Sequence, residues 1–209
     1  LLHIGHAYSA LLNARMADEM GGRFLLRIED TDQTRAREDY KIAIFEDLAW
    51  LGLSWEVPVR VQSEHFSDYE DCIRKLWQMN AVYPCFCSRR QADAQALPSR
   101  DPEGQSHYGG TCRRLSRLEA ESRMADGHVY GWRLDTSSDA SASVWGDVVI
   151  AKPKAGSSYH IAVVADDALQ GVTHVVRGND IEAATPLHRL LQQLLNLSLI
   201  HISEPTRLR

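Results

Sequence analysis

This sequence lacks a long hydrophobic run. Its longest apolar stretches, such as residues 161–165, are far too short to cross a bilayer, which takes about 20 apolar residues. No signal peptide is visible either. These absences predict a cytoplasmic protein that has no membrane partner.

The sequence also lacks an excess of positive charge. Lys and Arg total 23 against 28 Asp and Glu, which leaves a net charge of −5. No overall basic field would attract a nucleic acid, so any contact with RNA must come from local patches. The 209 residues are 44% hydrophobic and 24% charged, a composition typical of one or two globular domains.

Cysteine is scarce and unevenly placed, at positions 72, 85, 87 and 112. Three of the four lie in one short polar segment, which indicates a metal site rather than a disulfide framework and fits a reducing compartment. The alternative is that these three are free thiols in a loop. Cys72 falls in a predicted helix, where it is expected to be a small buried apolar residue.

Helical and strand patterns alternate along the chain, although no Gly-x-Gly-x-x-Gly motif follows a predicted strand, which argues against an unrelated Rossmann-type nucleotide-binding protein. We expect helices at 7–20, 35–51, 66–80, 116–127 and from 185 onward, and strands at 23–28, 57–62, 128–135, 144–151, 161–165 and 172–176. After Pro84 the pattern stops, and residues 85–115 are expected to be an insertion outside the core. The predicted organisation is therefore a first half over 1–84, an inserted module over 85–152 and a second half over 153–197.

Two strings carry residues suited to chemistry. His3-Ile4-Gly5-His6 opens a predicted helix, and a helix N-terminus favours phosphate. Gly5 would let the backbone approach a ligand closely, and two imidazoles can donate hydrogen bonds to phosphate oxygens. The string Glu29-Asp30-Thr31-Asp32 follows a predicted strand, at the edge where ligands bind in open α/β sheets. Taken alone, the first string equally fits two surface histidines before a helix.

Five strings together resemble the class I glutamyl-tRNA synthetase group. They are His3-Ile4-Gly5-His6, Arg27-Ile28-Glu29-Asp30-Thr31-Asp32, Trp50-Leu51-Gly52-Leu53, Gln62-Ser63-Glu64 and Val175-Val176-Arg177-Gly178. The resemblance covers nearly all of residues 1–197. Segments 85–87, 108–112 and 157–164 are similar to those of the small paralogues that lack an anticodon-binding domain. The resemblance implies an α/β fold, namely a Rossmann-like class I aminoacyl-tRNA synthetase catalytic domain with an inserted zinc-binding module.

The resemblance also implies a ligase activity. The small paralogues activate glutamate with ATP to glutamyl-adenylate and transfer it to the queuosine base of tRNA(Asp), not to the terminal ribose. The implied partners are ATP with Mg²⁺, L-glutamate and tRNA(Asp) carrying queuosine, and a monomer is expected.

The same resemblance implies roles for individual residues. His3 and His6 would be catalytic and, with Gly5, would bind ATP. Glu29 would hold the substrate ammonium, and Tyr159 and Arg177 would hold the glutamate from the opposite side. For Arg177, the alternative is an ion pair with one of three acidic residues, Asp166, Asp167 or Asp180.

The cysteine spacing suits one structural zinc ion. Cys85 and Cys87 are two residues apart, so a sharp turn can point both sulfurs at one ion, and Cys112 is the obvious third ligand. The resemblance implies Tyr108 as the fourth. A phenol with a solution pKa of about 10 is an unusual ligand that competes only through the charge of the ion. The neighbouring His107 is the chemically ordinary alternative.

Three features depart from the family pattern. The first strand of the sheet, with an arginine expected to contact glutamate, should precede His3, and the chain does not start with Met. A second motif with its lysine should follow residue 197, and nothing there resembles it. Residues 198–209 look like a translated sequencing adapter. We therefore expect a truncated and inactive fragment with a non-native tail and an unpaired sheet edge.

Two other functions stay open. One is a truncated glutamyl-tRNA synthetase that charges tRNA(Glu). The other is a zinc-stabilised RNA-binding module that has lost catalysis.

Overall fold

The computed structural model describes residues 2–153, 156–197 and 201–203. The chain divides into two compact units. The first comprises Leu1–His65, Thr173–Glu182 and Ile200–Arg209, and the second comprises Phe66–Val172 and Ala183–Leu199. Over the ranges described, no helix combines the length and the apolarity needed to cross a membrane.

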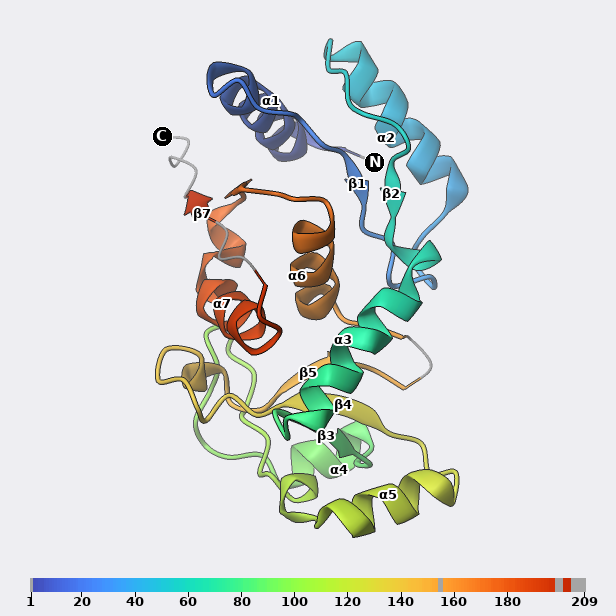
Figure 1. Ribbon diagram of the computed structural model, residues 1–209, viewed down its shortest axis with the longest axis vertical. Helices are drawn as coiled ribbons and strands as arrows, with labels where there is room; N and C mark the ends of the chain where they lie inside the picture. Colours follow the sequence, from blue (N-terminus) through green and yellow to red (C-terminus); the bar gives the residue numbers. More distant parts are fainter. Residues whose placement is uncertain (1, 154–155, 198–200, 204–209) are drawn as a thin grey trace. The chain divides into compact units, whose positions relative to one another are not determined.

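The first unit contains short parallel strand pairs and two long helices (Figure 1). Its elements are α1 (Ile4–Glu19), β1 (Arg27–Ile28), α2 (Glu38–Trp50), β2 (Arg60–Val61), the 3-10 turn η1 (Gln62–Glu64), β6 (His174–Val176) and β7 (His201–Ser203). Strand β1 pairs in parallel with β2, and β6 pairs in parallel with β7. The predicted strands at 23–28 and 57–62 are real, but only two residues of each are paired.

The second unit is built on an antiparallel sheet of order β3-β4-β5. Its elements are α3 (Phe66–Gln78), β3 (Val82–Cys85), α4 (Arg89–Ala94), η2 (Cys112–Arg114), α5 (Arg117–Ala125), β4 (Gly131–Leu134), η3 (Ser143–Trp145), β5 (Val148–Ala151), α6 (Tyr159–Leu169) and α7 (Thr185–Leu194). Helix η4 (Asn179–Ala184) connects β6 to α7. Helix α6 packs against α3, α7 and β5.

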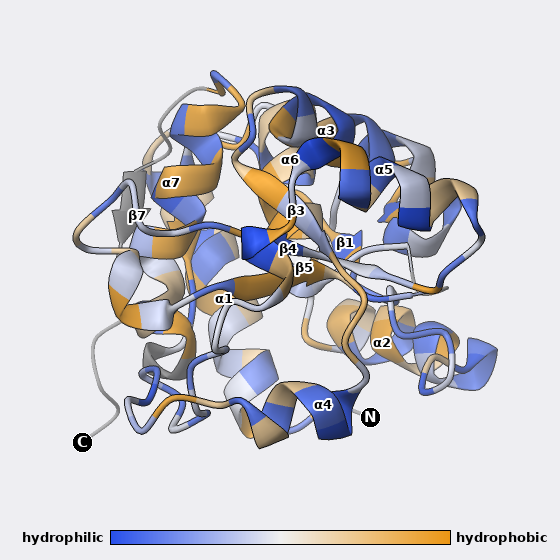
Figure 2. Cartoon of the chain, turned by 90° about the horizontal axis from the view of Figure 1, so that it is seen from below, coloured by the Kyte–Doolittle hydropathy of each residue, from blue (hydrophilic) through white to orange (hydrophobic). Residues whose placement is uncertain are grey.

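Helix boundaries that depend on local chemistry were predicted well. Gly52 follows the last residues of α2 with a φ of +80°, the left-handed conformation that favours glycine after a helix. Ser116 caps α5, and its side chain forms a reciprocal capping box with Glu119. The helix predicted from residue 185 onward is confirmed as α7. Its residues Leu187, Leu190 and Leu191 are buried, and Figure 2 shows both apolar and polar residues on this helix.

The strand predicted at 161–165 is wrong, because these residues form the middle of helix α6. All seven residues from Ile161 to Asp167 are buried. A helix that is buried on every side shows no amphipathic stripe, so its sequence reads as the same continuous apolar run that a central strand would show. The run therefore gave no local signal that could separate the two structures.

The expectation that residues 85–115 stay outside the core is also wrong. Cys85, Tyr108 and Cys112 form a buried apolar cluster with Tyr83. The segment also contains helix α4, which Ser88 and Gln91 cap reciprocally. This Ser-x-x-Gln pattern is the signal that could have predicted α4. Of the predicted tail at 198–209, only 201–203 are described, as β7; its other residues lie outside the described ranges.

Candidate functional site

The first turn of α1 is organised by its two histidines. His3 is the N-cap, and its Nδ1 accepts the backbone N–H of Gly5 at 3.1 Å. In return, Nδ1 of His6 accepts the backbone N–H of His3 at 3.2 Å. The two rings lie close together, with centroids 3.8 Å apart. The string predicted to bind phosphate is therefore a capping box in which imidazoles replace the usual hydroxyl and carboxylate.

These contacts determine which ring nitrogens can act on a ligand. An Nδ1 that accepts a hydrogen bond carries no proton, so each ring presents its Nε2–H as a donor. Desolvation, and then the nearby His3 ring, lowers the pKa of His6 below its ordinary value of 6.5. Because both histidines are exposed, two imidazole N–H donors are available beside the N–H groups of a helix N-terminus.

Gly5 has a structural role beside the predicted one. A Cβ at this position would lie 2.9 Å from Cε1 and 3.1 Å from Nδ1 of the His3 ring. The missing side chain therefore makes room for the capping imidazole. A close approach to a ligand stays a prediction, whereas the close approach to His3 is a feature of the fold.

Two neighbouring acidic residues at the end of β1, Glu29 and Asp30, have different partners. Asp30 is buried, and its carboxylate accepts the backbone N–H and the hydroxyl of Ser63 at 2.8 and 2.7 Å and pairs with Lys41 Nζ at 2.7 Å. Desolvation works to raise the pKa of Asp30, but the hydrogen bonds from Lys41 and Ser63 outweigh it and hold the pKa below 3.8. Asp30 thus connects two of the strings that carry the resemblance, and its role is structural.

Glu29 remains more accessible than Asp30. Its carboxylate pairs with Arg27 at 2.9 Å, yet its side chain is 40% exposed. Asp32 accepts hydrogen bonds from the backbone and hydroxyl of Thr34, as a turn-forming carboxylate does. Asp32 is 55% exposed, so Glu29 and Asp32, unlike the buried Asp30, are both accessible to a cationic group of a ligand.

Arg177 directly follows β6, which lies next to α1. Nδ2 of Asn13 in α1 donates to the carbonyl of Val176 at 3.2 Å, so the first helix and the strand before Arg177 are directly bonded. Of the alternative ion-pair partners, Asp166 is buried in α6, where it accepts the Tyr69 hydroxyl at 2.9 Å. The side chain of Asp180 lies outside the described part of the chain.

Tyr159 begins α6 and belongs to the second unit. Its ring lies 5.7 Å from that of His160 and 5.8 Å from that of His188. His160 and His188 are joined by a ring nitrogen contact of 3.1 Å. His3, Gly5, His6, Glu29 and Arg177 all belong to the first unit, and their convergence with Tyr159 on one substrate stays a prediction.

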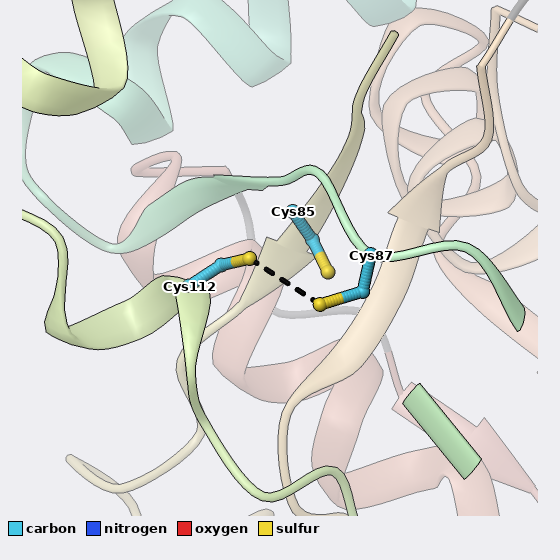
Figure 3. A group of neighbouring side chains, drawn as sticks. All are labelled: Cys85, Cys87 and Cys112. Atoms are coloured by element: carbon cyan, nitrogen blue, oxygen red, sulfur yellow. Dashed lines mark hydrogen bonds between the residues drawn. The ribbon is translucent and has the colours of Figure 1, made fainter. Parts of the chain in front are cut away.

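Three cysteines of the second unit are brought together. The sulfurs of Cys85, Cys87 and Cys112 lie within 4.8 Å of one another, and those of Cys87 and Cys112 are 3.6 Å apart (Figure 3). Zn–S bonds of about 2.3 Å in a tetrahedron place two sulfurs about 3.8 Å apart. The donor set and its spacing thus fit a zinc ion.

The two candidates for a fourth ligand are placed differently. The hydroxyl of Tyr108 lies 3.2 Å from the sulfur of Cys87 and accepts the backbone N–H of Cys112 at 3.0 Å. The ring of His107 instead contacts the hydroxyl of Ser99 through Nδ1 and the carbonyl of Val144 through Nε2, both at 3.0 Å. The hydroxyl oxygen of Tyr108 therefore already lies beside the cysteines, whereas both ring nitrogens of His107 are engaged by Ser99 and Val144.

The cysteine cluster favours one thiolate even without a cation. Hydrogen bonding from Cys85 and Tyr108 outweighs burial and lowers the pKa of Cys112 to about 6. Hydrogen bonding to Cys112, together with burial, raises the pKa of Cys85 to about 12. Binding of a metal ion would therefore have to release the proton held by Cys85, whereas Cys112 is already disposed to be a thiolate.

Comparison with known proteins gives the class to which this fold and these strings belong. Residues 1–208 match the family described as tRNA synthetases class I (E and Q), catalytic domain. The chain belongs to this family, and it is therefore a catalytic domain of a ligase of the aminoacyl-tRNA synthetase type.

Three relatives show which members of the family are similar to this chain. The Glutamyl-Q tRNA(Asp) synthetase of Rhodobacter capsulatus is 39% identical, over 94% of this chain and 79% of the relative. The protein of the same name from Symbiobacterium thermophilum is 39% identical, over 93% of this chain and 67% of the relative. The glutamate–tRNA ligase of Aquifex aeolicus is 33% identical, and the chain spans 44% of it.

A solved structure supports the fold. The glutamate–tRNA synthetase of Elizabethkingia anophelis superposes with a TM-score of 0.84 over 97% of this chain and 47% of its own, at 22% sequence identity. At this identity the similarity establishes the architecture and leaves the substrate open.

Proposed function

We propose that this protein activates glutamate with ATP and transfers it to the queuosine base of tRNA(Asp), with one structural zinc ion and with Mg²⁺ bound by ATP. The observation that carries the proposal is the 39% identity to two proteins named Glutamyl-Q tRNA(Asp) synthetase, of which the chain spans 79% and 67%. The glutamate and ATP parts of the proposal draw on the site residues, whereas the queuosine part depends on these relatives.

The activation step requires no protein nucleophile. A carboxylate oxygen of glutamate attacks the α-phosphorus of ATP, and pyrophosphate leaves. Catalysis is then a matter of positioning and of stabilising charge on phosphate oxygens. The Nε2–H groups of His3 and His6 are the donors for that charge, and the helix N-terminus behind them adds a partial positive charge.

The substrate is held by charge complementarity. Glu29, an accessible carboxylate, would take the ammonium group in competition with Arg27. Arg177 and Tyr159 would bind the glutamate from the other side, the guanidinium through a carboxylate. In the transfer step, a nucleophile of the queuosine base attacks the carbonyl of the mixed anhydride, and AMP leaves.

The zinc ion has a structural role in this proposal. Cys85, Cys87, Cys112 and Tyr108 would hold it next to the antiparallel sheet of β3, β4 and β5, which begins before the predicted module at 85–152. The ion would connect Cys85 at the end of β3 to Cys112 at the start of η2.

The activation step is tested by ATP–pyrophosphate exchange with the full product of the gene. We expect His6→Ala to reduce glutamate-dependent exchange at least tenfold, because losing one donor to the developing charge costs more than about 2 kcal/mol. Exchange at the wild-type rate in this variant would refute the role of His6.

The acceptor is tested with labelled glutamate and three RNAs, namely tRNA(Asp) with queuosine, the same tRNA without it, and tRNA(Glu). We expect label only on the first. Label on tRNA(Glu) would favour the second candidate, a glutamyl-tRNA synthetase, which the 33% identity to glutamate–tRNA ligases supports. Binding of tRNA with neither exchange nor label would indicate an RNA-binding module instead.

A further inference from the structure

We propose that Arg133 is a positioning residue of the metal centre, which orients Cys85 and Tyr108 and balances the negative charge of the ligands. The inference rests on the zinc site proposed above. It concerns a residue that lies 21 positions beyond Cys112 in the sequence and that no spacing rule connects with the cysteines.

The register of the sheet brings Arg133 to the cluster. Arg133 of β4 is opposite Tyr83 of β3, and Cys85 is opposite Gly131. Side chains two residues apart on a strand share a face, so Arg133 and Cys85 are diagonal neighbours on one face. The position directly opposite Cys85 carries no side chain, and a Cβ there would lie 2.7 Å from the carbonyl oxygen of Ala151. The glycine therefore lets the backbone of Ala151 approach β4 closely, and it places no side chain opposite Cys85.

The guanidinium of Arg133 makes three contacts at once. Nε donates to the sulfur of Cys85 at 3.4 Å, and Nη1 donates to the carbonyl of Asp147 at 2.7 Å. The plane of the group lies over the ring of Tyr108, with Cζ 4.2 Å from the ring centroid. The hydrogen bond to Asp147 fixes the guanidinium. Its Nε edge then contacts Cys85, and its face contacts the ring of Tyr108. Only a planar cation can make all three contacts.

The charge of the proposed centre requires such a cation. Three thiolates and one phenolate bring four negative charges against the two positive charges of Zn²⁺. Cys85, Tyr108 and Cys112 are each less than a tenth exposed, and uncompensated charge is costly in a buried site.

Other contacts to the ligand atoms come from neutral groups. The amide of Gln95 donates to Cys87 at 3.2 Å, and the backbone N–H of Cys112 donates to the hydroxyl of Tyr108. Arg113 follows Cys112 in the sequence, but its guanidinium pairs with Asp135 and Asp147. Among the contacts that the structure describes around these ligand atoms, the guanidinium of Arg133 is the group that brings positive charge.

The test compares zinc affinity in matched arginine variants of the full chain, by competition with a chromophoric chelator. We expect Arg133→Gln to weaken zinc binding 10- to 100-fold, the range for loss of an outer-sphere partner, and Arg133→Lys to fall between this variant and wild type. Arg123→Gln is the control. Arg123 is exposed, and its Cζ lies over the ring of Phe86, 5.7 Å from the ring centroid. Phe86 is the residue between Cys85 and Cys87 in the sequence. We expect this control to stay within twofold of wild type.

A second measurement separates charge compensation from a purely structural role. In the Co²⁺-loaded chain, Arg133→Gln should shift the sulfur-to-cobalt charge-transfer band, Arg133→Lys should shift it less because the positive charge is kept, and Arg123→Gln should not shift it. Zinc binding by Arg133→Gln within twofold of wild type, an equal loss in Arg123→Gln, or an unshifted band in Arg133→Gln would overturn the inference alone. A wild-type chain that binds neither zinc nor cobalt would overturn the proposed metal site and this inference with it.

Discussion

A single methyl group at Gly5 is expected to impair the first turn of α1 without unfolding it. In Gly5→Ala, the new Cβ would lie 2.9 Å from Cε1 of His3, so the imidazole must move and its 3.1 Å bond to the backbone of residue 5 is lost. Loss of an N-cap costs about 1 kcal/mol. Replacing Gly by Ala in a helix returns about 1 kcal/mol. The free energy of unfolding should therefore stay within about 1 kcal/mol of wild type.

In contrast to the stability, the ATP–pyrophosphate exchange activity of Gly5→Ala should fall. Displacing the His3 ring removes a donor from the proposed phosphate site, so ATP–pyrophosphate exchange should fall at least tenfold, as in His3→Ala. Stability is measured by urea unfolding, and exchange is measured on the same preparations with the full product of the gene. Because Gly5 is expected to act through His3, the double variant should be no slower than His3→Ala alone.

Two results would refute this reasoning. Wild-type exchange in Gly5→Ala would mean that the position of the His3 ring does not matter for catalysis. Losses that multiply in the double variant would mean that Gly5 acts on the ligand directly, as the sequence by itself suggested.

The remaining predictions concern the metal ligands and the buried ion pair. Tyr108→Phe should weaken zinc binding in chelator competition and His107→Ala should not, because only the tyrosine presents its donor atom to the cysteines; the reverse ranking would make His107 the ligand. Lys41→Met should lower the free energy of unfolding by about 1–3 kcal/mol, because the buried carboxylate of Asp30 loses its cation while the hydrogen bonds from Ser63 remain. Since the pKa of Asp30 is lowered from 3.8, its stabilisation is complete above pH 3.8 and is lost as the pH falls through the value in the folded protein. Urea unfolding should therefore show the gap between wild type and Lys41→Met narrowing below pH 3.8, and a constant gap would contradict this assignment.

The sequence predicted only part of the proposed metal site. The cysteine spacing identified Cys85, Cys87 and Cys112 as a group, and the sulfurs do lie together. The sequence left Tyr108 and His107 open, because neighbouring residues differ only in the direction of their side chains. It did not point to Arg133, whose distance from Cys85 depends on the pairing of β3 with β4.

The acidic residues after β1 show a similar limit. The sequence placed Glu29, Asp30 and Asp32 together after a predicted strand, and in the structure they contact Arg27, Lys41 and Thr34 respectively. The particular partners of Asp30 could not be predicted, because Lys41 comes from α2 and Ser63 from η1. Both reach the strand end only when the two segments have folded around it.

By itself, the sequence determined the family, the cysteine cluster and the helix ends, because motifs, ligand spacing and caps act over a few neighbouring residues. The tertiary structure alone decided that residues 161–165 are helical, since an entirely apolar run satisfies the helical and the extended periods equally. It also decided that the space at Gly5 receives the His3 ring and that Arg133 reaches Cys85 across 48 residues. Contacts of this kind depend on packing and strand register, which no short stretch of sequence encodes.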